Sequence, residues 1–352
     1  MALLYKNRDY YFIDHKDFIT SIYKSVTDGE NEKLSFSILT KLFSIINIDK
    51  TQSYRKRSHN SDNIHEEVSR SLLGPCFLEL PLPMKDNLIS KYKVLDTANV
   101  RDLSKELFES TIFDMEGVNG GNNSNTALKC KVKGNIFYIP PNSRFYCGCV
   151  KEQCLKLEGS KFDIVVADPP WWNKYIRRLK GANDKLSYSM MYNEDIASIP
   201  VQNLLSDNCL VAMWCTNAPS NVAAVKNIIF PKWGVEYIAT WFWIKVTVDL
   251  QPICSFASGC KKQPYERIIL GKVGAIKDIS DCQLVVSVPS ALHSHKPPLL
   301  DLLSPYSMSE DPQTLELFAR YLLPNTTSVG YEPLKWQHES LYEENSRMEI
   351  LL

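Results

Sequence analysis

The chain has 352 residues, of which 44% are hydrophobic and 23% are charged, and this composition is typical of a globular protein with one or two domains and a large core. Its 40 Lys and Arg side chains balance 40 Asp and Glu side chains. This balance excludes a protein that binds nucleic acid through a global positive field, so a nucleic-acid partner requires a local basic patch.

The ten cysteines are scattered without a CxxC pair or the spacing of metal ligands. The densest cluster, Cys147, Cys149 and Cys154, has no His or carboxylate at ligand spacing. We therefore expect reduced thiols in an intracellular protein and no metal site. Because Lys6 and Arg8 interrupt the N-terminus, no signal peptide is expected, and no apolar run approaches the roughly 18 residues of a membrane span.

Residues 1–126 are predicted to form a mainly helical, partly disordered accessory region. Seven apolar residues in it recur at helical spacing and should form one buried face: Leu34, Ile38, Leu39, Leu42, Phe43, Ile45 and Ile46. The polar stretch 49–70 contains Tyr54-Arg-Lys-Arg57, which is either a nuclear-import or phosphate-contacting element or a solvated loop. Residues 85–115 are predicted to be helical, and the Gly- and Asn-rich stretch 117–125 is predicted to be a linker.

A catalytic domain is predicted over residues 127–342, followed by a C-terminal tail of residues 343–352. Expected strands lie at 135–139, 162–167, 209–214, 238–246, 267–273, 284–288 and 327–331, and expected helices at 194–205, 220–229, 297–303 and 312–322. This alternation predicts an α/β fold with a Rossmann-like, doubly wound, mainly parallel sheet. No GxGxxG follows the first strand, so a nicotinamide dinucleotide site is not expected.

The apolar strand 162–167 stops at Asp168-Pro169-Pro170-Trp171, because two prolines force the chain out of the sheet. Ligands of open α/β sheets lie at the carboxyl ends of strands. There, Asp168 and the Asp168 or Pro169 carbonyl can accept both N–H groups of an exocyclic amine, while Trp171 offers a ring face to the base. Such a site would aim the nitrogen lone pair at a methyl group by positioning and electrostatics. The alternative is a strand-ending turn whose Trp belongs to the core.

The loop that follows the tetrad is rich in basic and aromatic residues. A single-stranded nucleic acid needs such phosphate contacts and stacking surfaces, whereas the alternative is a solvated loop with incidental charge. The residues concerned are Lys174, Tyr175, Arg177, Arg178, Lys180, Lys185 and Tyr188.

The Asp-Pro-Pro-Trp tetrad after an apolar strand resembles the signature of the adenine amino-methyltransferases that use S-adenosylmethionine. Further motifs in the family's order resemble its methyltransferase-like 4 branch: Trp243-Ile-Lys-Val-Thr247, Lys261-Lys-Gln-Pro-Tyr-Glu266, Ile269-Leu-Gly-Lys272, Leu292-His-Ser-His-Lys-Pro-Pro298 and Glu316-Leu-Phe-Ala-Arg320. The resemblance covers residues 134–340 and implies a class I S-adenosylmethionine-dependent methyltransferase with permuted motif order, in which segments after the tetrad hold the cofactor.

The resemblance also implies a role for each matching residue. The catalytic residues are Asp168, Pro169, Pro170 and Trp171. The cofactor-binding residues are Cys149, Val150, Asp168, Lys272, His295, Arg320, Tyr331 and Glu332. The substrate-binding residues are Trp171, Asn173, Lys174, Arg177, Arg178, Tyr188, Lys261 and Lys262.

Three of these assignments also have a reading without the resemblance. Lys272 would otherwise be a surface lysine at a strand end, and Arg320 would be a charge at the C-terminus of a helix, stabilised by the dipole. His293 and His295 make a poor metal pair because an i, i+2 spacing points them to opposite sides of an extended loop. We therefore expect Ser294, His295 and Lys296 to line the pocket.

The sequence departs from the family's pattern at three positions. Relatives usually have an Asp at the position of Cys149 and an Asn at that of Tyr331, and Gln263 interrupts the Lys-Lys-Pro-Tyr-Glu motif. Each departure removes or shifts a hydrogen bond of about 1 kcal/mol. We therefore expect cofactor affinity to be lowered by roughly tens of fold.

Two classes of function remain: a working adenine amino-methyltransferase, and a nucleic-acid-binding scaffold whose cofactor pocket has decayed. The intact Asp168 favours the enzyme, because a decayed copy has no reason to keep a costly carboxylate in a pocket. RNA is the expected substrate, with single-stranded DNA as the alternative. The resemblance implies an internal 2′-O-methyladenosine of U2-type small nuclear RNA, a nuclear location and a monomer.

Overall fold

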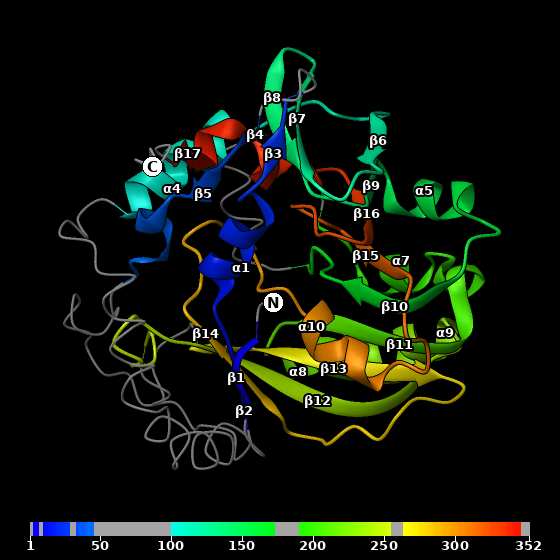
Figure 1. The fold of residues 1–352 in the computed structure, drawn as a ribbon. Coiled ribbons are helices and arrows are strands. Elements are labelled where there is room, and N and C mark those ends of the chain that lie inside the picture. Colours follow the sequence, from blue (N-terminus) through cyan, green and yellow to red (C-terminus); the bar gives the residue numbers. More distant parts are fainter. Residues whose placement is uncertain are drawn as a thin grey trace.

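The protein is built around one large β-sheet that runs through the whole molecule (Figure 1). The computed structural model describes residues 3–6, 10–28, 33–45, 100–172, 190–254 and 263–345. Within them, an 11-stranded sheet has the order β1-β2-β14-β12-β13-β11-β10-β15-β16-β9-β6. In chain order these strands are β1 (Leu3–Lys6), β2 (Tyr10–Ile13), β6 (Asn119–Asn122), β9 (Ser143–Cys147), β10 (Phe162–Ala167), β11 (Leu205–Cys215), β12 (Glu236–Lys245), β13 (Tyr265–Val273), β14 (Leu284–Ser287), β15 (Thr314–Leu317) and β16 (Thr326–Gly330).

The centre of the sheet is parallel. Strand β10 pairs in parallel with β11 on one side and with β15 on the other, and β15, β16 and β9 continue in the same direction. Strand β13 runs antiparallel between β11 and β12. The predicted α/β fold with a mainly parallel sheet is confirmed. Every strand predicted in the catalytic region is present, 135–139 and 162–167 with the predicted bounds and the others with one or both ends shifted by one to four residues.

Both faces of strand β10 are covered, as in a doubly wound sheet. Val165 belongs to a core that includes residues of α7 (Asn193–Ala197) and of the π-helical turn Val225–Ile229. Val166 points to the opposite face, where the core includes residues of α10 (Leu300–Leu303). Because successive side chains of a strand alternate between faces, a continuous apolar run such as β10 requires this double cover.

The other helices are short: α1 (His15–Ile22), α4 (Val100–Ser110), α5 (Val150–Lys156), α8 (Pro219–Ala224) and α9 (Phe230–Lys232), with 3₁₀ turns at Thr40–Phe43, Val201–Leu204, Ser304–Tyr306, Lys335–Gln337 and Glu339–Leu341. The predicted helix 194–205 is thus divided between α7 and a 3₁₀ turn, with residue 205 already in β11. Among the described residues, no helix is long and apolar enough to cross a membrane.

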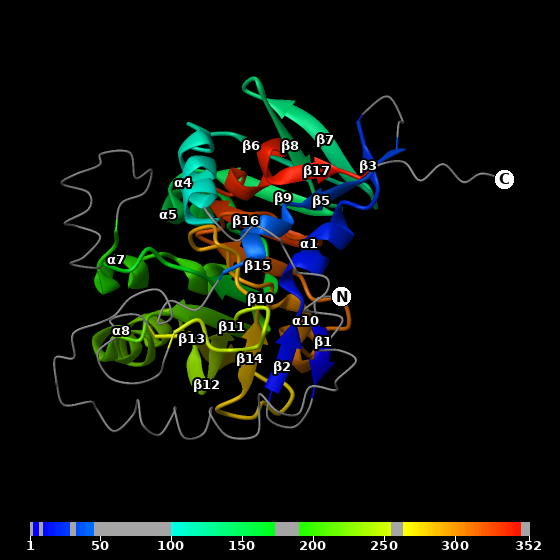
Figure 2. The same ribbon diagram turned by 90° about the vertical axis from the view of Figure 1, so that its left-hand side faces the viewer.

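The N-terminal region is part of the main fold, and its described segments are not mainly helical. Strand β2 extends the large sheet by pairing in parallel with β14. A second sheet has the order β4-β3-β7-β8, formed by Val26–Thr27 (β3), Lys33–Leu34 (β4), Ala127–Val132 (β7) and Asn135–Ile139 (β8). Figures 1 and 2 show it at one end of the molecule, beside α4. The expected linker contains β6, which pairs with β9, so no structural separation lies at residues 117–125.

The predicted amphipathic helix from Leu34 to Ile46 is wrong. The segment contains the end of β4, strand β5 (Phe36–Ile38) and a 3₁₀ turn, and Ile46 lies outside the described residues. Strand β5 pairs with β17 (Tyr342–Glu344), which is far away in the sequence and runs from the last residue of the expected catalytic domain into the expected C-terminal tail. This tertiary pairing overrides the local helical spacing, as is common for short apolar segments.

The predicted helix at residues 312–322 is also wrong, and this error concerns the site directly. Thr314–Leu317 is β15, a buried strand between β10 and β16. Its residues alternate between polar and apolar with the period of a strand. The apparent helical period arose because Tyr321 and Leu322, which follow the strand, are buried as well.

Candidate active site

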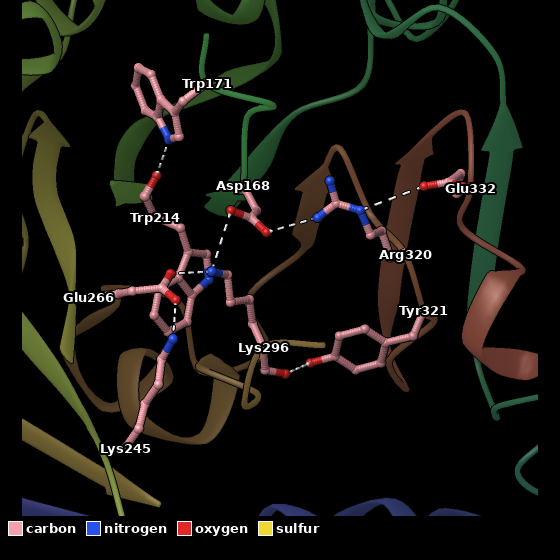
Figure 3. A network of polar contacts seen from close by, with 9 residues as sticks. All are labelled: Asp168, Trp171, Trp214, Lys245, Glu266, Lys296, Arg320, Tyr321 and Glu332. Carbon is pink, nitrogen blue, oxygen red and sulfur yellow. Dashed lines mark hydrogen bonds and ion pairs between the residues drawn. The ribbon is translucent and has the colours of Figure 1, made fainter. Parts of the chain in front are cut away.

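Three neighbouring parallel strands end side by side and bring together charged residues that are far apart in the sequence. Ala167 of β10 pairs with Leu317 of β15, which pairs with Val329 of β16. The residues that follow these strands therefore meet at one edge of the sheet. There the Arg320 guanidinium contacts both Asp168 (Nη1 to Oδ2, 3.2 Å) and Glu332 (Nε to Oε2, 3.6 Å) (Figure 3).

On its other side, Asp168 faces Lys296, which lies in the loop after β14. The Lys296 Nζ is 3.9 Å from Asp168 Oδ1, and it also forms an ion pair with Glu266. Glu266 is paired with Lys245 as well. Lys245 is the last residue of β12, and Glu266 lies near the start of β13. The antiparallel pairing of these strands places Trp243 opposite Glu266 at this same edge.

The result is a row of alternating charges, which we call the charged row. In spatial order it consists of Lys245, Glu266, Lys296, Asp168, Arg320, Glu332 and Lys335. The last pair, Lys335 Nζ to Glu332 Oε1, is 2.8 Å long, and the Lys335 side chain is only 1% exposed. Such desolvated charges are tolerated because each has a partner, and removing one partner is costly.

The pKa shifts follow from this arrangement. Burial raises the pKa of Asp168, and the neighbouring Lys296 and Arg320 oppose that rise. Burial alone would raise the pKa of Glu266, but Lys245 and Lys296 lower it overall. Burial alone would lower the pKa of Lys296, but Asp168 and Glu266 raise it. The site thus keeps Lys296 cationic beside a carboxylate whose affinity for a proton is increased.

The turn after β10 is held by its own backbone and by Trp171. The Trp171 N–H donates to the Pro169 carbonyl (2.8 Å), and the Met191 N–H donates to the Pro170 carbonyl (2.9 Å). The Trp171 ring is 7% exposed, and its indole N–H donates to the Trp214 carbonyl (3.0 Å). The prediction that Trp171 offers a ring face to the base is therefore wrong for this structure. Its ring belongs to the core and fixes the turn that presents Asp168.

Lys272 does not reach the site. It lies on β13, is paired with Leu210 in the β11 ladder and contacts Glu236 at 3.6 Å. Because β13 is antiparallel to β11, its C-terminal end points away from the edge where Asp168 lies. The sequence assignment assumed that the end of this strand faces the cofactor, which holds only for a parallel strand. Lys296 is the lysine that the structure brings to Asp168.

His295 also points away from the charged row. Its ring is 3% exposed and packs against the rings of His15 (centroids 4.7 Å apart) and Tyr321 (4.8 Å). Burial lowers the pKa of His295 to about 3. Tyr321 donates its hydroxyl to the Lys296 carbonyl at 2.7 Å. His295 therefore supports the loop that carries Lys296, and the structure gives no cofactor-facing position to its ring.

The two residues that depart from the family's pattern contact each other. Cys149 and Tyr331 follow β9 and β16, which are neighbours, and the Gly148 N–H donates to the Gly330 carbonyl between them (2.8 Å). Burial and a hydrogen bond with Cys149 raise the pKa of Tyr331. Val150, the first residue of α5, is buried beside them. These residues extend the edge of the sheet beyond Glu332.

Several predicted substrate residues lie outside the described part of the chain. They are Asn173, Lys174, Arg177, Arg178, Tyr188, Lys261 and Lys262. Their roles remain predictions. Within the described residues, no group of three or more His, Cys, Asp or Glu side chains is arranged to hold a metal ion.

Sequence reasoning missed four acidic or basic residues at or beside the site, which are Lys245, Glu266, Glu316 and Lys335. Glu266 and Lys245 were quoted only as motif letters, although both lie in otherwise apolar strands, which is an available signal for a buried charge. Glu316 lies on β15 next to Asp168, and burial together with that carboxylate raises its pKa to about 8. The sequence prediction had placed Glu316 in a helix, whereas it lies on β15.

Comparison with known proteins agrees with this geometry. Residues 162–332 match the model of the MT-A70 family. This segment belongs to the MT-A70 family. It begins with β10 and ends at Glu332, so it contains the whole charged row except Lys335.

Three relatives illustrate the similarity. The human N(6)-adenine-specific methyltransferase METTL4 is 37% identical over 230 residues, covering 62% of this chain and 47% of the relative. A Caenorhabditis elegans DNA N6-methyl methyltransferase is 40% identical over 220 residues, covering 60% of this chain and 57% of the relative. The Pyricularia oryzae N6-methyladenosine RNA methyltransferase MTA1 is 30% identical over 224 residues, covering 61% of this chain and 58% of the relative. The chain spans about half the length of the curated relatives it matches.

MT-A70 methyltransferases use S-adenosylmethionine, and the side chains of the site fit this cofactor. Its amino-acid end carries a carboxylate, which matches the Lys296 ammonium in charge. Cys149, Val150, Tyr331 and Glu332 lie farther along the same edge, where the adenosine end of such a cofactor would be held.

Proposed function

We propose that this protein is an S-adenosylmethionine-dependent methyltransferase that modifies the 6-amino group of adenosine in RNA. The observation that carries the proposal is the position of Asp168 at the carboxyl end of β10. It is 3.2 Å from Arg320 and 3.9 Å from Lys296, on a turn fixed by the buried Trp171. A carboxylate held in this way can orient an exocyclic amine, which is the main requirement of this chemistry.

Each step that the chain performs concerns positioning and charge. S-adenosylmethionine, when bound, supplies a methyl group on a positively charged sulfur. Asp168 accepts an N–H of the adenine amine and directs its lone pair. When the amine nitrogen takes the methyl group, the sulfur–carbon bond of the cofactor would break, and the raised pKa of Asp168 favours transfer of the amine proton to this carboxylate. Arg320 and Lys296 hold the carboxylate in place.

RNA is the proposed substrate, and DNA is a second candidate because the C. elegans relative is named as a DNA methyltransferase. Support for RNA comes from the methyltransferase-like 4 resemblance and from the name of the P. oryzae relative. The same resemblance supports an internal 2′-O-methyladenosine of U2-type small nuclear RNA, a nuclear location and a monomer as further parts of the proposal.

The test is transfer of labelled methyl groups to matched RNA and DNA oligonucleotides with one adenine, each RNA made with and without the 2′-O-methyl group. Nucleoside analysis by mass spectrometry would identify the product. We expect N6-methylated adenosine in RNA and the fastest transfer to the 2′-O-methylated form. Transfer to DNA alone would overturn the choice of RNA, and transfer to neither would favour the decayed scaffold.

A further inference from the structure

Two aromatic side chains stack on each other beside the catalytic turn. Trp172 follows the tetrad directly, and Tyr192 precedes helix α7. Their ring centroids lie 6.0 Å apart, and the ring planes are inclined by 18°. Tyr192 is 59% exposed, the highest value among the exposed large hydrophobic side chains of the described residues. Isolated exposed apolar residues are common, but a stacked and ordered pair at the edge of an active site calls for a reason.

Backbone hydrogen bonds hold this pair in a fixed position relative to Asp168. The Trp172 N–H donates to the Met191 carbonyl (3.2 Å), the Met191 N–H donates to the Pro170 carbonyl (2.9 Å), and Trp171 and Met191 form a parallel β-bridge. The Tyr192 carbonyl accepts from the Ile196 N–H (3.1 Å), which fixes the backbone of Tyr192 at the start of α7. Asp168 and Trp172 therefore share one turn, and Tyr192 is held beside it through the neighbouring Met191.

We propose that Trp172 and Tyr192 form a stacking platform for a nucleobase that neighbours the target adenosine in a single-stranded nucleic acid. This inference rests on the proposed function, since it specifies how that substrate is held. One face of Tyr192 is supported by Trp172, and the exposed side chain offers the other face to solvent. A flat aromatic face selects a planar ligand, and only unpaired bases have free faces to stack on it.

The two adjacent tryptophans have different roles in this proposal. Trp171 is buried and holds the turn through the Trp214 carbonyl, whereas Trp172 is half-buried and stacks on the exposed Tyr192. Stacking of a base on an aromatic ring tolerates every base. The pair should therefore fix the register of the strand across the site without reading its sequence.

The experiment measures binding of fluorescein-labelled single-stranded RNA and DNA by anisotropy, with the full chain and saturating S-adenosylmethionine. Tyr192→Leu keeps an apolar side chain but removes the ring, and it should weaken binding by about 5- to 100-fold. Tyr192→Phe keeps the ring and should bind as wild type does. Met308→Ala removes another exposed apolar side chain (52% exposed) and should leave binding of the single strand unchanged. None of these substitutions should change the binding of a blunt duplex.

A scan with abasic nucleotides then locates the base. At one position next to the adenine, an abasic site should weaken binding to the wild type by the same factor as Tyr192→Leu weakens binding of the intact strand. The abasic site at this position should not weaken binding to the Tyr192→Leu variant any further. Unchanged binding by Tyr192→Leu, or losses that multiply at every abasic position, would overturn the platform.

Methylation of the same oligonucleotides by wild type judges the proposed function separately. If the wild type methylates the oligonucleotides and the Tyr192→Leu variant binds them normally, the platform is rejected and the proposed function is kept. Ring-dependent binding without any methylation would keep the platform and reject the enzymatic proposal.

Discussion

At the scale of single residues, Lys296 is the cation that distinguishes this site from a simple strand-ending turn. Its side chain is 12% exposed and contacts both Asp168 and Glu266. The Lys272 side chain, in contrast, forms an ion pair with the exposed Glu236. The two lysines therefore form a matched pair for mutation, since the sequence assigned Lys272 to the cofactor and Lys296 to the pocket lining, and only Lys296 lies at the site.

We expect Lys296→Gln to abolish detectable cofactor binding and to lower the free energy of unfolding by about 3 kcal/mol, because it leaves buried carboxylates short of a partner. Lys272→Gln breaks an exposed pair and should cost about 0–1 kcal/mol with normal cofactor binding. Calorimetric titration with S-adenosylmethionine and urea unfolding of both variants check this. Equal effects of the two substitutions would contradict the assignment.

The contact between Cys149 and Tyr331 changes how these two departures are understood. A thiol is a weak acceptor, yet here it has a phenol as its partner. We still expect the double change Cys149→Asp and Tyr331→Asn to tighten S-adenosylmethionine binding, by about 1–3 kcal/mol in sum. Because the side chains touch, the single changes should not add up to the double change.

The measurement is a calorimetric double-mutant cycle. If wild type already binds in the low micromolar range and the double variant binds no tighter, the existing pair is an adequate substitute, and the expected weakness of this site is refuted.

At the scale of elements, apolar runs predicted the strands of the catalytic region well, because β10, β11 and their neighbours are buried on both faces and carry a signal of their own. What failed was any feature that depends on a distant partner. Strand β15 has four residues and is identified by its place between β10 and β16. The direction of β13, which removes Lys272 from the site, is likewise set by its neighbours.

The packing of α1 against the loop that carries Lys296 predicts a dependence of stability on pH. Burial is the main cause that lowers the pKa of His15, and the nearby His295 lowers it further. Burial also lowers the pKa of His295, to about 3. Below the unfolded-state pKa of about 6.5, the unfolded chain binds protons that the folded protein does not, so the free energy of unfolding falls as pH falls. Glu316 opposes this trend, because its pKa is raised to about 8 in the folded state.

The contribution of His15 is isolated by comparing wild type with His15→Gln. From pH 6 to pH 5 the free energy of unfolding of wild type should fall by about 1 kcal/mol more than that of the variant. Urea unfolding at several pH values measures this difference, and parallel pH profiles would show that the ring of His15 titrates normally in the folded protein.

At the scale of the whole molecule, the N-terminal segments complete the core that supports the site. Tyr10, Ile19 and Phe36 share one hydrophobic cluster with Ile244 of β12 and Val286 of β14. The division at residue 126 that composition favoured therefore does not separate two cores. The periodicity of the N-terminal segments could not reveal this, because β2 and β5 are short and are stabilised by partners about 270 and 300 residues away.

The neutral net charge of the chain makes nucleic-acid binding depend on local cations, of which the sequence indicates Arg177 and Arg178. Replacing both with Gln should weaken binding of single-stranded RNA equally for all sequences. Each lost phosphate contact should reduce the log–log salt slope by about 0.7. Binding titrations from low to moderate salt test this, and an unchanged slope would show that neither arginine contacts phosphate.

The central claim is that Asp168 directs the adenine amine while the cofactor is held mainly by other groups. Its most direct test is methyl transfer by Asp168→Ala and by the isosteric Asp168→Asn, with S-adenosylmethionine binding measured calorimetrically on the same samples. We predict that transfer to an adenine-containing oligonucleotide falls by about 10²-fold or more, while cofactor affinity stays within a few-fold of wild type. If Asp168→Asn retains more than about a tenth of the wild-type rate, the carboxylate does not orient the amine, and the account is contradicted.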